Sequence, residues 1–141
     1  MKQVIQLFSL WTFAAVTMAG LDAGGAEKKR WLSEIGYGLM FHYEAFRNHT
    51  PESYNKAVDS FDVVRFADSV GSTGAGHVIF VVGQHWGKYC APNSVYEKLL
   101  GVENGVWTSR RDLIMEIGKE LAKCDVRLIL YMTARAPMRH Y

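Results

Sequence analysis

The sequence has little net charge, few cysteines and none of the short motifs that mark common metal and nucleophile sites. Sixteen Lys and Arg against fourteen Asp and Glu leave a formal charge of +2, and no long run of like charges occurs. Because a domain that binds nucleic acid usually carries a basic stripe or patch, we expect no nucleic-acid partner. HExxH, CxxC and GxSxG are all absent, which argues against the sites those motifs build. We therefore expect no metal and no cofactor.

Only two cysteines occur, Cys90 in a predicted loop and Cys124 on a predicted helix. Two cysteines do not establish a disulfide framework, so we expect two free thiols. The 141 residues are 49% hydrophobic and 21% charged, which is ordinary for a globular protein and fits one domain at most. Seven Phe, four Trp and seven Tyr serve either a core or stacking on flat ligands such as sugar rings.

Residues 1–26 predict a secretory signal peptide. A short basic start, MKQ, leads into a long apolar stretch and then into small residues. Cleavage after Ala26 places Ala26 and Gly24 at the last and third-last positions, and cleavage after Ala19 is a second option. The alternative is an uncleaved anchor, but polar residues inside the stretch make it a poor span. We expect a secreted or periplasmic protein with no stable membrane span, whose mature part is residues 27–141.

The first half of the mature chain predicts a strand, a helix and a strand. Tyr37–His42, YGLMFH, predicts the first strand, and the polar residues 43–60 after it predict a loop. FDVVRFADSV carries apolar residues at helical spacing, with Asp62 suited to the N-cap, and the glycines of GSTGAG end that helix. Val78–Val82 is uninterrupted and rich in β-branched residues, which is typical of a parallel strand covered on both faces.

The second half begins with a long connection, residues 83–108, which includes a segment suited to a short helix, SVYEKLLG. Connections of this length are usually functional or disordered, and the aromatic residues here argue against disorder. Ser109 and Asp112 form the pattern of a capping box, predicting Ser109 as the N-cap of a helix that reaches about Lys123. VRLILY, Val126–Tyr131, predicts a third buried strand.

The order β-α-β-α-β predicts an α/β fold with three parallel strands and two crossover helices. The eight-stranded TIM barrel and the open doubly wound sheet share this opening. A barrel usually needs about 250 residues, so we expect residues 27–141 to be the N-terminal part of a truncated barrel.

Both architectures place ligand sites at the carboxyl ends of parallel strands. The polar and aromatic residues at the three predicted strand ends are His42, Tyr43 and Glu44, then Gln84, His85 and Trp86, and finally Tyr131 and Thr133. A single histidine at a strand end can simply cap it, but several such residues at one edge favour a pocket. His77 begins its strand at the opposite end, and we expect it to be structural.

These segments, read in order, resemble the start of the α-L-fucosidases of glycoside hydrolase family 29. The matching phrases are Trp31 before YGLMFHYE (family F-x-H-W-G), Glu52-Ser53-Tyr54 (E-W-Y), FDVVRFADSVGSTGAG, QHWGKY (K-H-H-D-G-F), Arg111-Asp112-Leu113 and LILYMT (L-Y-Y-S). The resemblance covers nearly all of residues 31–133. It implies a TIM barrel and a carbohydrate substrate, an α-L-fucoside or a related glycan. It further implies that His42, Glu52 and His85 bind sugar hydroxyls, with Trp86 and Tyr131 lining the pocket.

The resemblance also implies a retaining mechanism, in which two carboxylates stand about 5–5.5 Å apart. The family's nucleophile is an Asp after the fourth strand, a position beyond residue 141, so we assign no catalytic residue here and expect residues 27–141 to be inactive alone. The paired histidines have become one and the acidic residue after them is gone. These departures keep two alternatives open: a non-catalytic carbohydrate-binding protein derived from such an enzyme, and an unrelated open α/β domain that binds a small ligand.

Overall fold

The computed structural model describes residues 33–45, 50–83 and 87–133. The chain divides into two compact units, Met1–Glu34 and Ile35–Tyr141, and every strand and helix discussed below belongs to the second. The predicted signal peptide lies outside the described residues. In the part of the chain that is described, no helix has the length and apolar character needed to cross a bilayer.

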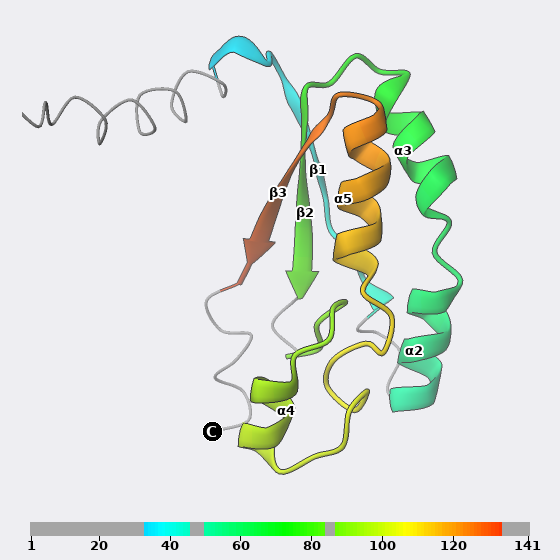
Figure 1. The fold of residues 1–141 in the computed structure, drawn as a ribbon, viewed down its shortest axis with the longest axis vertical. Helices are drawn as coiled ribbons and strands as arrows, with labels where there is room; N and C mark the ends of the chain where they lie inside the picture. Colours follow the sequence, from blue (N-terminus) through cyan, green and yellow to red (C-terminus); the bar gives the residue numbers. More distant parts are fainter. Residues whose placement is uncertain (1–32, 46–49, 84–86, 134–141) are drawn as a thin grey trace, which may run out of the picture. The chain divides into compact units, whose positions relative to one another are not determined.

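Three parallel strands form one sheet in the order β1-β2-β3 (Figure 1). Their bounds are Gly38–Phe41 for β1, His77–Gly83 for β2 and Arg127–Met132 for β3. Each predicted strand is confirmed to within two residues at each end. Because all three run in the same direction, their carboxyl ends lie along one edge of the sheet, which we call the rim.

Within the described residues that follow β1, four helices accompany the sheet. They are α2 (Pro51–Asp59), α3 (Val63–Gly71), α4 (Ser94–Leu100) and α5 (Leu113–Lys123). The two expected crossover helices are α3 and α5, and Asp62 caps α3 through a bond from the Arg65 amide to its carboxylate. The short helix expected within the long connection is α4. Each connection between strands therefore contains two helices.

Helix α2 corrects the prediction of a loop over residues 43–60. Thr50 and Ser53 form a capping box in which each side chain bonds the other residue's backbone amide. Pro51 occupies the first turn, where its missing amide hydrogen costs nothing. Tyr54 and Val58, one turn apart, are both buried. The helix forms because two apolar residues at positions i and i+4 are buried in the core. The mostly polar composition of the segment gives no indication of this burial.

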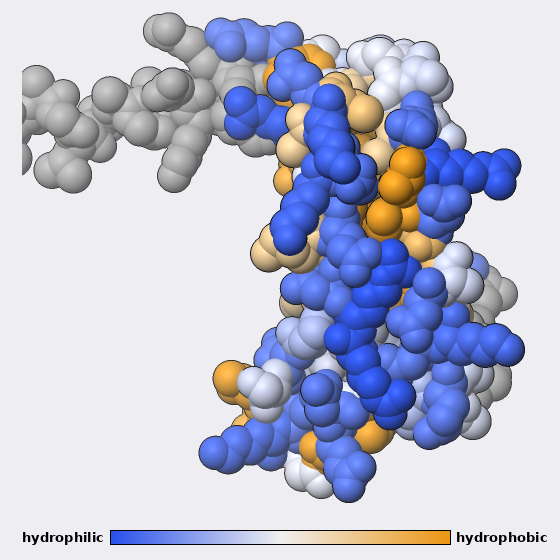
Figure 2. Space-filling model, turned by 45° about the vertical axis from the view of Figure 1, so that its right-hand side comes forward, coloured by the Kyte–Doolittle hydropathy of each residue, from blue (hydrophilic) through white to orange (hydrophobic). Residues whose placement is uncertain are grey.

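The core lies between one face of the sheet and the helices α3 and α5, which pack side by side (Figure 1). Val78 and Phe80 of β2 point into it, as do the register partners of Phe80 and Val78 on β1, Phe41 and Leu39. The helices contribute apolar stripes at 3.6-residue spacing: Ala67 and Val70 from α3, and Leu113, Ile117 and Leu121 from α5. The side of the molecule that carries the helices is mostly hydrophilic outside, with separate small hydrophobic patches (Figure 2).

The start of α5 differs from the prediction. Its N-cap is Asp112, whose carboxylate accepts a bond from the Met115 amide at 2.9 Å. Ser109 is fully buried, and its hydroxyl donates to the Arg111 carbonyl at 2.6 Å. The predicted Ser109 cap is therefore wrong. Ser109 instead holds the turn that leads into the helix.

Strand β3 is less buried than its apolar sequence predicts. Leu130 is 52% exposed and Met132 is 55% exposed, whereas Val78, Phe80 and Val81 of the central strand are almost fully buried. The cause is the position of β3, which is an edge strand of the described sheet, paired on one side with β2 and packed against α5. The fold is α/β with a parallel sheet, as predicted, and is consistent with part of a barrel; a closed barrel is not seen in the described residues.

Candidate functional site

Beyond the end of β1, successive side chains at the rim alternate between exposed and half-buried positions. His42 and Glu44 are exposed, and Tyr43 between them is half-buried. This alternation follows from the extended backbone, in which successive side chains point to opposite faces. The sequence placed all three residues at the rim, and the structure leaves only His42 and Glu44 facing solvent.

Tyr43 anchors helix α2 instead of facing a ligand. Its hydroxyl donates to the Ala57 carbonyl at 3.3 Å, and its ring packs against Phe61 and Phe80. Burial raises the pKa of the Tyr43 phenol to about 12. The phenol therefore stays protonated at neutral pH and serves as a hydrogen-bond donor that positions α2 beside the rim.

Tyr131 lies at the same edge on the third strand. It pairs in register with Val81 of β2, one residue beyond the pair of Phe41 and Phe80 that precedes His42. Tyr131 is 42% exposed. Just beyond it, the Thr133 hydroxyl donates to the Gly83 carbonyl at 3.5 Å, which joins the ends of β2 and β3. His42 and Tyr131 therefore lie at the same level of the sheet, one residue beyond the pair of Phe41 and Phe80.

Glu52 reaches this neighbourhood from a helix. It is exposed on the first turn of α2, and α2 lies near the carboxyl ends of the strands (Figure 1). The remaining two predicted site residues, His85 and Trp86, lie outside the described residues. Of the five, the structure therefore locates His42 and Tyr131 at the rim and Glu52 on the helix beside it.

Lys88 is a feature of this region that the sequence analysis does not single out. It is only 6% exposed, and its ammonium nitrogen lies 5.2 Å from the centroid of the Tyr54 ring on α2. A cation over an aromatic face is attracted by the electron-rich ring. Burial lowers the pKa of Lys88, and burial also raises the pKa of Tyr54. A lysine among aromatic residues after a buried strand is the sequence signal that could have pointed to it.

Two buried polar residues hold the long connection after β2. Asn55 of α2 donates to the Gly105 carbonyl at 2.8 Å and accepts from the Arg110 amide at 2.8 Å. Glu97 of α4 accepts from the Gly105 amide and from the Thr108 hydroxyl. Buried polar groups stabilise a loop when their bonds are made. These bonds hold residues 97–110 of the connection against α2, although the second carboxylate oxygen of Glu97 is buried without a hydrogen-bond partner in the described residues.

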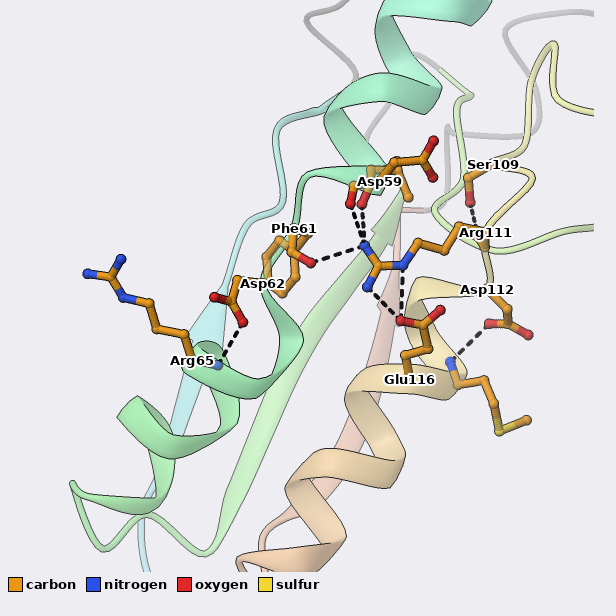
Figure 3. A network of polar contacts seen from close by, with 10 residues as sticks. Asp59, Phe61, Asp62, Arg65, Ser109, Arg111, Asp112 and Glu116 are labelled. Carbon is orange, nitrogen blue, oxygen red and sulfur yellow. Dashed lines mark hydrogen bonds and ion pairs between the residues drawn. The ribbon is translucent and has the colours of Figure 1, made fainter.

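Arg111 fastens α2 to α5 (Figure 3). Its guanidinium donates to the carbonyls of Val58, Asp59 and Phe61 at the end of α2. It also bonds the Glu116 carboxylate at 2.5 Å, and this hydrogen bond lowers the pKa of Glu116. A cation at the C-terminal carbonyls complements the negative end of the helix. The R-D-L motif is therefore a structural clamp in this chain.

A cavity of about 220 Å³ opens beside the rim. It is lined by the ends of two strands and by the connection that carries α4: Val82, Met132, Tyr89, Ala91, Pro92, Asn93 and Tyr96. The rings of Tyr89 and Tyr96 meet edge to face, with centroids 5.1 Å apart. Most of this lining is apolar or aromatic, as in small-molecule sites generally.

The described residues contain no group of three His, Cys, Asp or Glu side chains arranged to hold a metal ion. Both thiols are free, as expected from the sequence. Cys90 is fully buried beneath the rim, and its sulfur lies 3.2 Å from the Val82 carbonyl oxygen. Burial raises the pKa of Cys90 to about 12. This thiol therefore behaves as a core residue and not as a nucleophile.

Solved structures similar to this chain are bacterial fucosidases. A GH29 α-L-fucosidase from Bacteroides thetaiotaomicron matches with a TM-score of 0.52 and 15% identity, over 79% of this chain and 30% of that one. A bacterial fucosidase with a monovalent iminocyclitol inhibitor matches with a TM-score of 0.53 and 14% identity, over 77% and 30%. No protein-family model and no curated protein matches the sequence.

This likeness concerns the fold, because the identities are low. The resemblance predicted from the sequence is confirmed at that level, since the solved neighbours are GH29 α-L-fucosidases. The chain spans about a third of their length.

Proposed function

We propose that the rim binds a sugar, an α-L-fucoside or a related glycoside. We further propose that this rim is part of the sugar-binding site of a fucosidase-like glycoside hydrolase. The observation that supports the proposal best is the parallel sheet, which brings His42 and Tyr131 to one edge from strands far apart in the sequence. The likeness to the fold of GH29 fucosidases points in the same direction.

The chemistry of the rim suits a sugar. Hydroxyl groups need closely spaced donors and acceptors, and the imidazole of His42 and the carboxylate of Glu52 supply both. The ring of Tyr131 offers an apolar wall for the hydrogen-bearing face of the sugar. We propose that His85 and Trp86, on the segment after β2, complete this pocket.

Hydrolysis with retention needs a nucleophile and an acid/base carboxylate about 5–5.5 Å apart. Glu44 and Glu52 are the carboxylates beside the described part of the rim, and neither is assigned this role. Since the chain corresponds to 30% of the fucosidases that it resembles, we propose that it binds sugar but does not complete the catalytic pair.

A non-catalytic carbohydrate-binding protein is the second candidate. The segment QHWG replaces the paired histidines and the acidic residue of the family phrase, which removes a carboxylate from the rim while keeping rings and amides that bind sugars. The two candidates differ in whether the protein to which this rim belongs hydrolyses the glycoside that it binds.

Titration calorimetry with methyl α-L-fucoside tests the proposed site on the full chain. We expect His42→Ala and Tyr131→Ala each to weaken binding by about tenfold, the usual effect of removing one good contact. Tyr37→Ala is the matched control, because Tyr37 is an exposed tyrosine at the opposite end of the sheet. Equal losses in Tyr131→Ala and Tyr37→Ala, or no binding by the unaltered chain, would contradict the proposed site.

Turnover is tested separately with 4-nitrophenyl α-L-fucoside. We expect binding without release of 4-nitrophenol. Release by the purified chain would show that it carries its own catalytic pair.

A further inference from the structure

A mainly apolar groove of about 510 Å³ runs along helix α5. The helix packs on one side against α3, and its apolar stripe faces the core. The groove lies where α5 meets the outer strand β3, and it is lined by Ala91, Asp112, Ile114, Met115, Gly118, Lys119, Ala122 and Leu128. Apart from Asp112 and Lys119, the lining residues are apolar. The groove is therefore a surface on which another apolar element can pack.

The part of the lining that α5 supplies has a bulky half and a small half. Ile114 and Met115 line the groove in the first turn of the helix, whereas Gly118 and Ala122 line it about one and two turns further along. Met115 is 54% exposed, so much of its surface remains to be covered. A second helix with the same division, running in the opposite direction, would place its bulky residues against the small ones.

The charged residues of the groove have the same polarity. Asp112 lies at the start of α5 and Lys119 about two turns later, and both are exposed. The ion pairs that the structure shows on α5 among the described residues join Arg111 to Glu116 and Lys123 to Glu120. Asp112 and Lys119 take part in neither. In an antiparallel pair of identical helices, Asp112 of one copy lies toward Lys119 of the second copy, and symmetry forms this pair twice.

We propose that this groove is the interface of a symmetric dimer, in which the α5 helices of two copies pack antiparallel about a two-fold axis near Gly118. A second copy is the occupant because shape and charge are both self-complementary, as a two-fold interface requires. One pair of helices is smaller than a standard interface, so we expect a weak dimer with a dissociation constant of about 10 to 100 μM. This inference is independent of the proposed sugar site.

Sedimentation equilibrium of the full chain, over a wide range of concentration, tests the dimer. Met115→Glu is the disrupting variant, and Val64→Glu is its matched control. Val64 is 52% exposed, close to the value for Met115, but it lies on α3 and does not line the groove. We expect Met115→Glu to raise the dissociation constant at least about tenfold, because it buries a charge without a partner. Val64→Glu should leave it unchanged.

Gly118→Ala separates the interface from the stability of the chain. A Cβ at this position would lie 3.6 Å from the Leu128 side chain, which is ordinary contact, and alanine favours a helix more than glycine does. We therefore expect a higher midpoint of urea unfolding, measured on dilute monomer. The same methyl group holds the two helices apart and should weaken the dimer.

Lys119→Glu tests the charges, and Gly118→Cys tests the axis. Lys119→Glu places two acids together and should weaken the dimer, most strongly at low salt. Gly118→Cys, in a Cys124→Ser background, should oxidise to a cross-linked dimer because the two thiols meet near the axis. Val64→Cys in the same background should not cross-link.

Two kinds of result would overturn the proposal. A full chain that stays monomeric at several hundred micromolar, far above the expected constant of about 10 to 100 μM, has no such interface, whatever other partner the groove takes. A dimer that Met115→Glu and Val64→Glu weaken equally, or that Gly118→Ala strengthens, forms through a different surface.

Discussion

At the scale of single residues, burial decides which of the side chains predicted at the rim remain accessible to solvent and ligands. Tyr43 and His42 are neighbours in the sequence and were placed together at the rim, yet Tyr43 turns inward and bonds the Ala57 carbonyl. Lys88 is nearly buried against Tyr54, an arrangement that depends on a contact between two segments far apart in the chain. Residue type indicates the possible chemistry, and solvent access decides whether it is used.

The two cysteines give a direct test of this point. Cys90 is fully buried with a pKa near 12, and Cys124 is exposed. Since the thiolate is the reactive form, we expect the folded chain to react with one equivalent of Ellman's reagent at pH 8. The guanidinium-unfolded chain should react with two.

The variants Cys90→Ala and Cys124→Ser identify the reacting thiol. Cys124→Ser should abolish the reaction of the folded chain. Rapid modification of Cys90 in folded Cys124→Ser would show that the region beneath the rim opens to solvent.

At the scale of elements, local patterns predicted the helices whose apolar stripes are evident and missed α2. Its sequence, PESYNKAVD, reads as polar, and its helix signals are Thr50, Pro51 and the pair Tyr54 and Val58. The cap of α5 shows a related difficulty, because two residues with suitable side chains, Ser109 and Asp112, lie three positions apart. Arg111 contributes to this choice by bonding the end of α2, which fixes the turn just before Leu113.

Asp112→Ala tests the observed cap. Removing an N-cap side chain costs about 1 kcal/mol, so we expect a loss of that size in the free energy of unfolding, measured by urea denaturation. Asp112→Asn is the matched control and should lose less, because an amide oxygen also accepts the bond from the Met115 amide. Equal losses in the two variants would contradict the capping role of Asp112.

At the scale of the whole molecule, the position of each strand in the sheet determines its burial. Val126–Tyr131 is apolar apart from Arg127, yet β3 exposes Leu130 and Met132 because it is an outer strand of the described sheet. An apolar edge strand is a surface on which further chain can pair. The solved fucosidases that resemble this chain are more than twice its length.

Export is a prediction at the same scale. We propose that residues 1–26 direct secretion and are removed, since a basic start, an apolar stretch and small residues follow one another there. Expression of the full chain in a bacterial host, followed by mass spectrometry of the periplasmic fraction, should find a mature protein that begins at Glu27, or at Gly20 if the alternative site is used. Retention of the intact chain in the cytoplasm would contradict this prediction.

The sequence by itself determined the strands, the helices α3 and α5, their alternation and hence the parallel sheet, because these depend on apolar periodicity and on local stop signals. It also supported the resemblance to the fucosidases, which the shared fold confirms. Only the tertiary structure decided that Tyr43 points inward, that Asp112 caps α5, that α2 forms and that Lys88 lies over Tyr54. These features depend on contacts between segments distant in the chain, and the free energy of such contacts is set by burial in three dimensions, which no local pattern contains.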